Sequence, residues 1–417
     1  MRSAMLNRLF QQSSIPGEYR SNFLHLYLDV AWVGVLNGTT ISFLSIYAIR
    51  LGATNLQIGL LAAIAAFVNL FLAIPASQWL QGQQTSRAVF TSAAVARIGY
   101  IPLIMLPWLF GEQTQITAIL VITFLMAIPL TAVGVGANAL FAEAVPSEYR
   151  AHVAGVRNSM LAITFMFTSL FSGYILDTMP FPAGYQVVFA IGTLGAAMSS
   201  LHLRFIRPIL SHPGMATADP GQTHRSLRNL SASLRIDVWR TPFQRVLLAL
   251  FAFHLTQYLP LPIFGIYNVR VLQLSDDNIG IGTALFYLCV LLGSTQIRKL
   301  VQRFGNRNIT GWSIAGLALY PIFLSLSRNA LHFYGVSLIG GLAFAFVSAS
   351  YANYMLEHIP AHDRTSYLAW YTIILNSAIL IGSLAGAAIA EVIGLSSALV
   401  LFGALRMLAA FLILRWG

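Results

Sequence analysis

The chain has 417 residues, of which 57% are hydrophobic and only 9% are charged, and its formal net charge is +11. A soluble globular protein carries about 25% charged residues, so this chain cannot cover a surface that faces water. The composition therefore excludes a water-soluble domain. The positive charge is attributed to membrane topology and anionic lipid head groups rather than to nucleic acid.

Twelve apolar stretches recur along the chain, each long enough for a helix to cross a hydrocarbon core of ~30 Å. We therefore expect an all-α membrane protein with twelve transmembrane helices. The expected spans are 23–49, 56–80, 88–110, 114–141, 152–177 and 184–206 in the first half, and 243–269, 278–300, 309–327, 330–357, 365–390 and 395–415 in the second. The ten-residue alternation of a membrane β-barrel does not occur.

The spans divide the chain into four expected parts. Residues 1–22 form a cytoplasmic N-terminal segment without the apolar core of a signal peptide. Residues 23–206 and 243–417 form two six-helix bundles, and 207–242 form a cytoplasmic central loop that is rich in arginine, proline and glycine. Two interpretations of residues 226–240 stay open: an amphipathic helix on the membrane surface, or a solvated linker.

The two bundles carry copies of the same motifs. Glu143-Ala-Val-Pro-Ser-Glu-Tyr-Arg150 and Glu357-His-Ile-Pro-Ala-His-Asp-Arg364 both read Glu-x-x-Pro-x-x-x-Arg, and the second begins 214 residues after the first (357 − 143). Gln57-Ile-Gly and Asn278-Ile-Gly likewise open the second and eighth spans. The repeats run in the same direction, which predicts parallel halves related by an axis along the membrane normal.

Basic residues predict the orientation. With the N-terminus inside, the cytoplasmic segments hold Arg2, Arg8, Arg20, Arg87, Arg150, the linker arginines, Arg298, Lys299, Arg303, Arg307, Arg364 and Arg415, whereas the opposite side holds Arg50, Arg270 and Arg328. Loops rich in Lys and Arg stay in the cytoplasm. We therefore expect a multi-pass protein of the bacterial inner (plasma) membrane with both termini cytoplasmic.

The loop after the eighth span resembles a signature of the major facilitator superfamily, Gly-x-x-x-Asp-Arg-x-Gly-Arg-Arg. Arg303, Gly305 and Arg307 fit that signature, while Gln302 stands where the family has Asp. The resemblance implies two pseudo-symmetric six-helix bundles around a central cavity. The chain lacks the span-four Arg before Gly134-Val-Gly136 and the span-five proline that proton-driven drug exporters often carry, so such antiport is not indicated.

The first helix carries the acidic candidate for coupling. Asp29 lies about two turns into the span and shares a helix face with Trp32 and Thr40, with Asn37 beside it. An ionisable group inside a membrane is costly and marks a functional site by default. Asp29 is therefore a candidate proton-binding carboxylate on the wall of a central cavity, with a structural ion pair as the alternative.

Arginines inside the spans are the cationic candidates. Arg157 lies two turns after Arg150, with Asn158 beside it, and is expected to hold an anionic group, to pair with Asp29 or to snorkel. For Arg97 we expect an inward structural pair, and for Arg406 we expect snorkelling towards the interface.

Spans seven and eleven supply the remaining substrate candidates. His254, Gln257 and Tyr258 precede two prolines that bend the seventh helix. Trp370, Tyr371 and Asn376 lie in the eleventh helix and are suited to an amphipathic or aromatic substrate. For each group, structural packing is the alternative interpretation.

The loops between spans supply candidates for a cytoplasmic gate. Glu143 and Glu357 end helices, where the helix dipole disfavours an anion, so each needs a nearby cation. The gate candidates are Glu143, Arg150, Arg303, Arg307, Glu357 and Arg364.

These observations predict a secondary active transporter that moves a small amphipathic or organic solute by alternating access, with proton coupling left open. The alternative is a non-transporting relative that acts as a membrane assembly factor or receptor. We expect no enzyme activity, cofactor, metal or nucleic-acid partner. The expected partners are a small-molecule substrate, the lipid bilayer and protons, and the expected state is a monomer.

Overall fold

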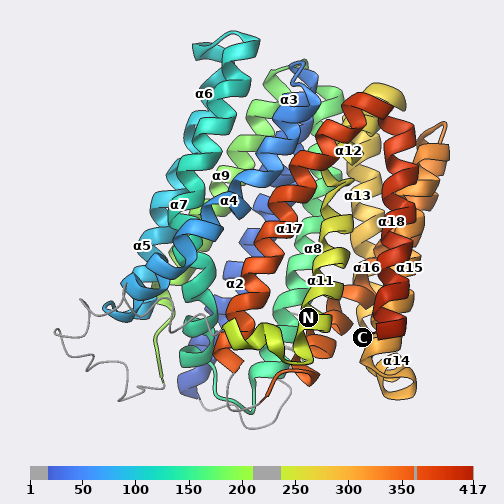
Figure 1. The fold of residues 1–417 in the computed structure, drawn as a ribbon. Helices are drawn as coiled ribbons and strands as arrows, with labels where there is room; N and C mark the ends of the chain where they lie inside the picture. Colours follow the sequence, from blue (N-terminus) through green and yellow to red (C-terminus); the bar gives the residue numbers. More distant parts are fainter. Residues whose placement is uncertain (1–16, 210–235, 361–363, 417) are drawn as a thin grey trace.

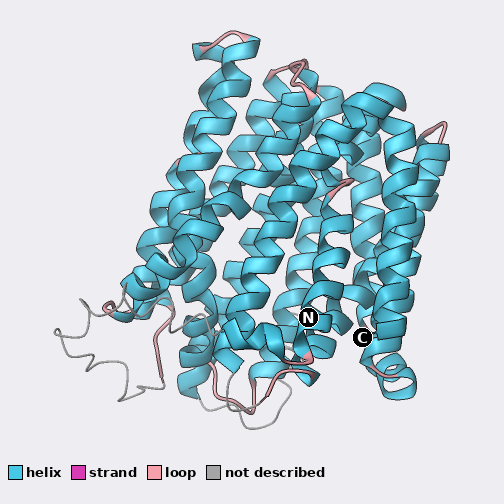
Figure 2. Ribbon diagram, in the orientation of Figure 1, coloured by secondary structure: helices cyan, strands magenta, loops and turns pink. Residues whose placement is uncertain are grey.

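The computed structural model describes residues 17–209, 236–360 and 364–416, and all regular structure in these ranges is helical (Figure 2). Residues 1–16 and most of the central loop lie outside the described part. So does most of the amphipathic segment considered at 226–240, of which only Ile236–Arg240 is described, as a short 3₁₀ helix, η3.

Twelve helical spans within the described residues are long and apolar enough to cross a membrane, as expected. The first half comprises α2 (Gly17–Leu36), η1 (Asn37–Ile41), α3 (Ser42–Arg50), α4 (Asn55–Gln81), α5 (Thr85–Ile98), α6 (Tyr100–Leu109), α7 (Glu112–Ala144), α8 (Arg150–Thr178) and α9 (Ala183–Phe205). The second comprises α11 (Phe243–Tyr258), α12 (Leu261–Ile266), η4 (Tyr267–Val271), α13 (Asp276–Ser294), α14 (Ile297–Phe304), α15 (Asn306–Leu326), α16 (Ala330–Glu357), α17 (Arg364–Ile393) and α18 (Leu395–Trp416).

The expected eighth span, 278–300, is wrong at its C-terminal end. Helix α13 stops at Ser294, and Ile297–Phe304 forms the separate helix α14. The charged side chains of Arg298, Lys299 and Arg303 explain the break, because they are better placed at a head-group surface than inside the hydrocarbon.

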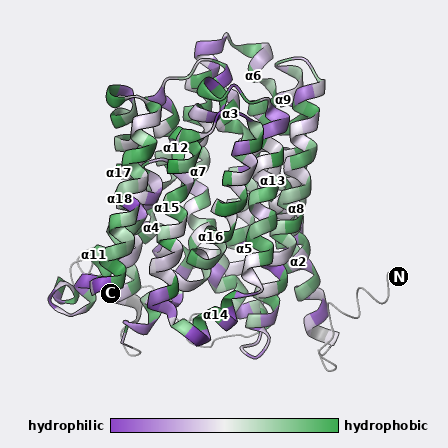
Figure 3. Cartoon of the chain, turned by 90° about the vertical axis from the view of Figure 1, so that its right-hand side faces the viewer, coloured by the Kyte–Doolittle hydropathy of each residue, from purple (hydrophilic) through white to green (hydrophobic). Residues whose placement is uncertain are grey.

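Hydrophobic residues run along the middle of the helices, whereas hydrophilic residues gather towards their two ends (Figure 3). Because each half contains six spans, the first and last described residues lie at the same end of the molecule, which we call the terminal end. The opposite end carries the α3 terminus at Arg50 (Figure 1), and we call it the Arg50 end.

Two helix pairs join the halves. Helix α8 packs against α13, and α4 packs against α17 (Figure 1). These pairs are the fifth and eighth spans, and the second and eleventh, so exchanging the halves converts one pair into the other. The structure thus has the two pseudo-symmetric six-helix bundles that the repeats predict.

Glycines set the distance between the helices of each pair. A Cβ atom on Gly59 would lie 2.7 Å from the carbonyl oxygen of Ser383, and one on Gly280 would lie 2.7 Å from that of Ser169. The two glycines are 221 residues apart, and they belong to the repeated Ile-Gly motif. The two serines are 214 residues apart, which is also the spacing of the two Glu-x-x-Pro-x-x-x-Arg motifs. The repeated Ile-Gly therefore marks a close contact between the halves, where the lack of a glycine side chain allows the helices to approach.

The residues just before these glycines start their helices in the same way. Thr54 accepts a hydrogen bond from the Gln57 backbone N–H, and Ser275 accepts one from the Asn278 backbone N–H, both at 3.2 Å. Such N-caps satisfy backbone donors that a helix start leaves open. The repeated Gln57 and Asn278 are thus the third residues of two equivalent capped helices.

Five further glycines inside the helices divide into two groups. A Cβ on Gly136, Gly173, Gly382 or Gly386 would lie within 3.0 Å of a neighbouring helix. Gly134 is different, because a Cβ there would meet nothing within 4 Å. Gly134 therefore makes no close contact with a neighbouring helix.

We predict that Gly280→Ala lowers the midpoint of thermal unfolding of the purified protein by several degrees. The added methyl group would overlap the Ser169 carbonyl, and overpacking of this kind costs about 1–3 kcal/mol. The matched control is Gly134→Ala, which has free space and should leave the midpoint unchanged or higher. Equal midpoints for the two variants would contradict the role given to Gly280.

Candidate functional site

A polar cluster lies inside the first bundle, around Asp29. Ser199 of α9 donates a hydrogen bond of 2.5 Å to Asp29 Oδ1, and Arg157 Nη2 of α8 lies 3.9 Å from Oδ2. Arg97 of α5 reaches the same region and donates to Ser200 Oγ at 2.8 Å and to the Ala196 carbonyl at 3.3 Å. Three helices thus direct polar side chains towards one carboxylate of the first helix.

The charges of this cluster are unbalanced. Asp29 is only 5% exposed and is the acid that faces both Arg97 and Arg157. The 3.9 Å separation from Arg157 is longer than a hydrogen bond, and the Arg157 Nε has no hydrogen-bond partner among the described atoms. Nearby, the Nδ1 atoms of His25 and His202 lie 3.1 Å apart. Asp29 is therefore the carboxylate on which the charges of two arginines of the first bundle converge.

The Asp29 face of the first helix does not form the wall that we expected. Thr40 is fully buried, and its hydroxyl group occupies the space beside Gly192 of α9. Asp29 is likewise turned to Ser199 of the same helix. The cluster is therefore enclosed within the first bundle rather than lining the space between the bundles.

The remaining candidates of the first bundle take no part in the cluster's described hydrogen bonds. Trp32 and Asn37 are half-buried, and Asn158 is exposed. Asn37 lies at the start of the π-helical turn η1, where its carbonyl accepts a bond from the Ser42 hydroxyl at 2.8 Å.

In the second bundle the structure brings two candidates together. His254 Nε2 of α11 lies 3.1 Å from the Tyr371 hydroxyl of α17, and the ring of His254 meets that of Tyr351 edge-on. His254 is buried, so this contact satisfies its polar ring. Tyr258, one turn further on, is half-buried beside the same group.

The other second-bundle candidates have separate surroundings. Gln257 lines a cavity of about 400 Å³, together with residues of α3, α12, α13 and α16. Trp370 packs edge-on against Trp239 at 5.5 Å between ring centroids. Asn376 donates a 2.8 Å bond to the Thr372 carbonyl of its own helix.

The expectation that Arg406 snorkels is wrong. Arg406 is 2% exposed and donates to the carbonyls of Thr256, Gln257 and Leu317 at 2.9–3.2 Å. Two of these carbonyls lack a helical donor for a simple reason. Pro260 and Pro321 each lie four residues later and have no N–H to offer. The buried guanidinium therefore satisfies the carbonyls that two prolines leave free.

The gate candidates make contacts within their own halves. Glu143 accepts a 2.8 Å bond from the Thr85 hydroxyl, and Arg150 donates to the Val145 and Ala142 carbonyls at the end of α7. Glu357 accepts a 2.7 Å bond from Asn306.

The arginines after the eighth span behave similarly. Arg303 lies over the Phe304 ring, and Arg307 donates to the Leu414 carbonyl. The side chain of Arg364 lies outside the described part of the structure. The described gate candidates thus brace the terminal-end loops of each bundle.

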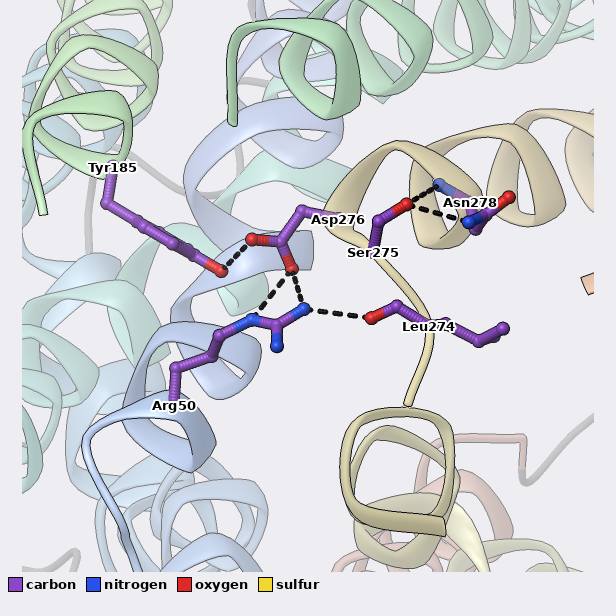
Figure 4. A network of polar contacts seen from close by, with 6 residues as sticks. All are labelled: Arg50, Tyr185, Leu274, Ser275, Asp276 and Asn278. Carbon is purple, nitrogen blue, oxygen red and sulfur yellow. Dashed lines mark hydrogen bonds and ion pairs between the residues drawn. The ribbon is translucent and has the colours of Figure 1, made fainter. Parts of the chain in front are cut away.

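A polar clasp that the sequence analysis missed lies at the Arg50 end. Arg50 Nη2 of α3 donates to Asp276 Oδ1 of α13 at 2.9 Å and to the Leu274 carbonyl at 2.9 Å (Figure 4). On its other side, Asp276 Oδ2 accepts a 2.6 Å bond from the Tyr185 hydroxyl of α9. A carboxylate of the second half is thereby held between two helices of the first.

A second clasp is its pseudo-symmetric partner. Arg270 donates to Asn55 Oδ1 at 3.0 Å and to the Ala53 carbonyl, and Asn55 Nδ2 donates to Glu391 Oε2 at 2.6 Å. Arg270 follows Arg50 by 220 residues, and Asp276 follows Asn55 by 221. That offset, close to the motif repeats, was the signal that could have revealed both clasps.

The described residues contain no group of three or more His, Cys, Asp or Glu side chains that could hold a metal. Both clasps lie at the Arg50 end, and near them the Ser169 hydroxyl of the first half donates to the Gly280 carbonyl of the second at 3.2 Å. The candidate site therefore has three parts: the Asp29 cluster, the cavity beside Gln257 and the clasps.

Sequence comparisons find a match between residues 246–417 and the family described as the Major Facilitator Superfamily. The chain is 21% identical over 387 residues to an uncharacterized MFS-type transporter of Methanocaldococcus jannaschii, which covers 91% of this chain and 94% of that protein. It is also 22% identical over 122 residues to Multidrug resistance protein 2 of Bacillus subtilis, but this match spans 29% of the chain and only 30% of that relative.

Solved structures share the fold over nearly the whole chain. A bacterial homologue of the iron transporter ferroportin in an inward-facing state has a TM-score of 0.71 at 13% identity, covering 97% of this chain and 99% of that one. A bacterial homologue of the human lysosomal transporter Spinster, also inward-facing, has a TM-score of 0.68 at 14% identity, with 97% and 98% covered. The chain is therefore a twelve-helix membrane protein of the major facilitator fold, and it resembles the Major Facilitator Superfamily in sequence over residues 246–417.

Proposed function

We propose that the chain is a secondary active transporter that moves a small amphipathic organic solute by alternating access. The observation that carries this proposal is the arrangement of the halves. Two pseudo-symmetric bundles meet through two glycine crossings and two polar clasps near one end, and a cavity of about 400 Å³ lies between α3 and the second bundle. Rocking of such halves about a fixed site is the general mechanism of parallel-repeat transporters.

In this proposal the Arg50 end faces the outside and is closed. The arginine-rich loops of the terminal end favour the cytoplasm. The clasps tie the bundles together at the opposite end, so the present arrangement is the inward-facing one. Two structural relatives bear that same description, which supports the assignment.

Opening of the Arg50 end requires both clasps to break. Arg50 would leave Asp276, and Arg270 would leave Asn55. The first clasp is a direct ion pair, whereas the second reaches its acid, Glu391, through Asn55. The charge-assisted bonds of such clasps are worth about 1.5–3 kcal/mol each, which is enough to set the balance between two conformations.

Proton coupling is assigned to Asp29. Protonation would remove the one negative charge that faces Arg97 and Arg157, and Arg157 would then be released from its partner. Arg157 lies on α8, the helix that also carries Ser169 and Gly173 at the contact with α13. A shift of α8 within the first bundle would therefore also alter its packing against α13 of the second bundle.

We predict that Asp29→Asn abolishes solute accumulation driven by a proton gradient but leaves solute exchange at equal pH intact. The amide can still accept a bond from Ser199, yet it cannot bind and release a proton. The protein is reconstituted in liposomes, and the solute is one selected by ligand stabilisation of the purified protein.

The matched control is Asp177→Asn, which neutralises an exposed acid at the Arg50 end and should keep gradient-driven accumulation. Undiminished accumulation by Asp29→Asn would remove Asp29 as the coupling group. A parallel loss of exchange would show that the variant is defective in binding or movement instead.

We predict that Arg50→Gln makes the cavity accessible from the Arg50 end. A cysteine is introduced by Ser45→Cys on the cavity wall in a Cys289→Ser background, and its modification by an impermeant thiol reagent is timed. Loss of the ion pair to Asp276 should raise the rate at least about tenfold, as expected for bonds worth about 1.5–3 kcal/mol.

Arg328→Gln provides the control for a change of charge, because Arg328 is exposed at the same end. It should leave the modification rate unchanged. If Arg50→Gln and Arg328→Gln gave the same rate as the parent protein, the Arg50 clasp would not hold that end closed.

A further inference from the structure

The cavity between α3 and the second bundle has six aromatic side chains among its nineteen lining residues. Its volume is about 400 Å³, and its aromatic lining consists of Phe264, Phe286, Tyr287, Tyr320, Phe333 and Phe344. Ligand pockets typically measure about 300–1,000 Å³, so this one suits a molecule of one or two rings. The flat faces of these aromatic side chains favour stacking with a planar ligand.

Asn268 provides an unused polar group on this lining. Asn268 is 6% exposed, and its Oδ1 is buried and has no hydrogen-bond partner among the described atoms. Leaving a buried acceptor unsatisfied carries a desolvation cost. A ligand that donates a hydrogen bond to Asn268, after rotation of its side chain towards the cavity, would remove that cost.

Arg406 provides an unused donor and an unneutralised charge. Its Nε and both Nη2 hydrogens are engaged by the Thr256 and Gln257 carbonyls, and one Nη1 hydrogen by Leu317. The second Nη1 hydrogen has no described acceptor. The described partners of Arg406 are carbonyl groups, which stabilise the charge as dipoles but do not neutralise it. Arg97 and Arg157, in contrast, both face Asp29.

The lining contains no Asp, Glu, Lys or other Arg. A cationic ligand would be repelled by Arg406 and would find no counter-charge on the walls. An anionic group placed beside Arg406 would neutralise a charge that is otherwise buried alone. The electrostatics of the cavity therefore select for an anion.

We propose that this cavity is the substrate site and that it binds a small aromatic monoanion, with the anionic group towards Arg406 and a hydroxyl or N–H donor on Asn268. The proposal rests on the transport function given above and specifies the class of its substrate. Tyr287 of the lining stacks on Phe165 of α8 at 3.9 Å between ring centroids. A ligand bound in the cavity would thus contact Tyr287 and could shift its stacking on Phe165, at the contact between the bundles.

The test uses equilibrium binding to the purified full-length protein, with no membrane gradient. The probe is 6-hydroxy-2-naphthoate, and two analogues each lack one of its polar groups: 2-naphthoate lacks the hydroxyl, and 6-hydroxy-2-naphthalenemethanol lacks the charge. We expect the hydroxynaphthoate to bind most tightly. Loss of the hydroxyl should weaken binding about tenfold, and loss of the charge should weaken it at least about tenfold.

Two variants test whether these ligand preferences arise from residues of the cavity. Asn268→Ala should weaken hydroxynaphthoate binding about tenfold while leaving 2-naphthoate binding unchanged, which is a double-mutant cycle that does not depend on Arg406. Arg406→Lys keeps the charge but loses the planar fork and should weaken both acids. Arg406 also holds three backbone carbonyls, so the Arg406→Lys result is used only if this variant unfolds at the same temperature as the parent protein. If it unfolds at a lower temperature, the Asn268→Ala cycle alone decides the test.

Asp177→Asn is the control for binding, since Asp177 is exposed and lies outside the cavity, and it should bind the probe like the parent protein. Failure of the hydroxynaphthoate to bind at millimolar concentration, equal binding of the neutral analogue, or an Asn268→Ala effect that is the same for both acids would overturn the proposal. Those outcomes leave proton-driven transport standing. Intact probe binding without gradient-driven accumulation would instead reject the transport function and keep the site.

Discussion

The structure depends on the close approach of backbones at two equivalent helix crossings. At Gly59 and at Gly280, the neighbouring carbonyl lies where a side chain would begin. These two crossings hold α4 against α17 and α13 against α8. They place the capped starts of α4 and α13 beside the C-terminal ends of η4 and α3. The Arg50 and Arg270 clasps can form only because the crossings hold those helix ends together.

Charge is distributed unequally between two otherwise similar halves. The first bundle encloses Asp29 with two arginines, whereas the second bundle encloses Arg406 with carbonyl groups that Pro260 and Pro321 help to free. The two halves therefore have the same fold but different buried charges. In the proposed mechanism, one half exchanges a proton, the other attracts an anion, and α8 connects the two through the stacking of Phe165 on Tyr287.

The architecture was predictable from the sequence because apolar length and repeated motifs depend on local composition. The twelve spans and the parallel halves were expected, whereas the pairing of Arg157 with Asp29 was one of three alternatives left open. The direction in which a helix face points was not predictable, since it depends on packing. Asp29 therefore faces α9 rather than the space between the bundles, and Arg406 is buried rather than snorkelling. The clasps were missed because Arg50 and Asp276 are distant in sequence, and because each lies at a helix end next to a loop, where charged residues are common.

The central claim is that the two ends of the molecule open alternately. Spin-label distances can be measured in one preparation for a pair at the Arg50 end, Thr178 and Gln273, and a pair at the terminal end, Ser147 and Asn308, while the pH is lowered. The account predicts opposite changes: one distance lengthens as the other shortens, and Asp29→Asn removes the response to pH. Distances that lengthen together, or that do not respond in the parent protein, would contradict it.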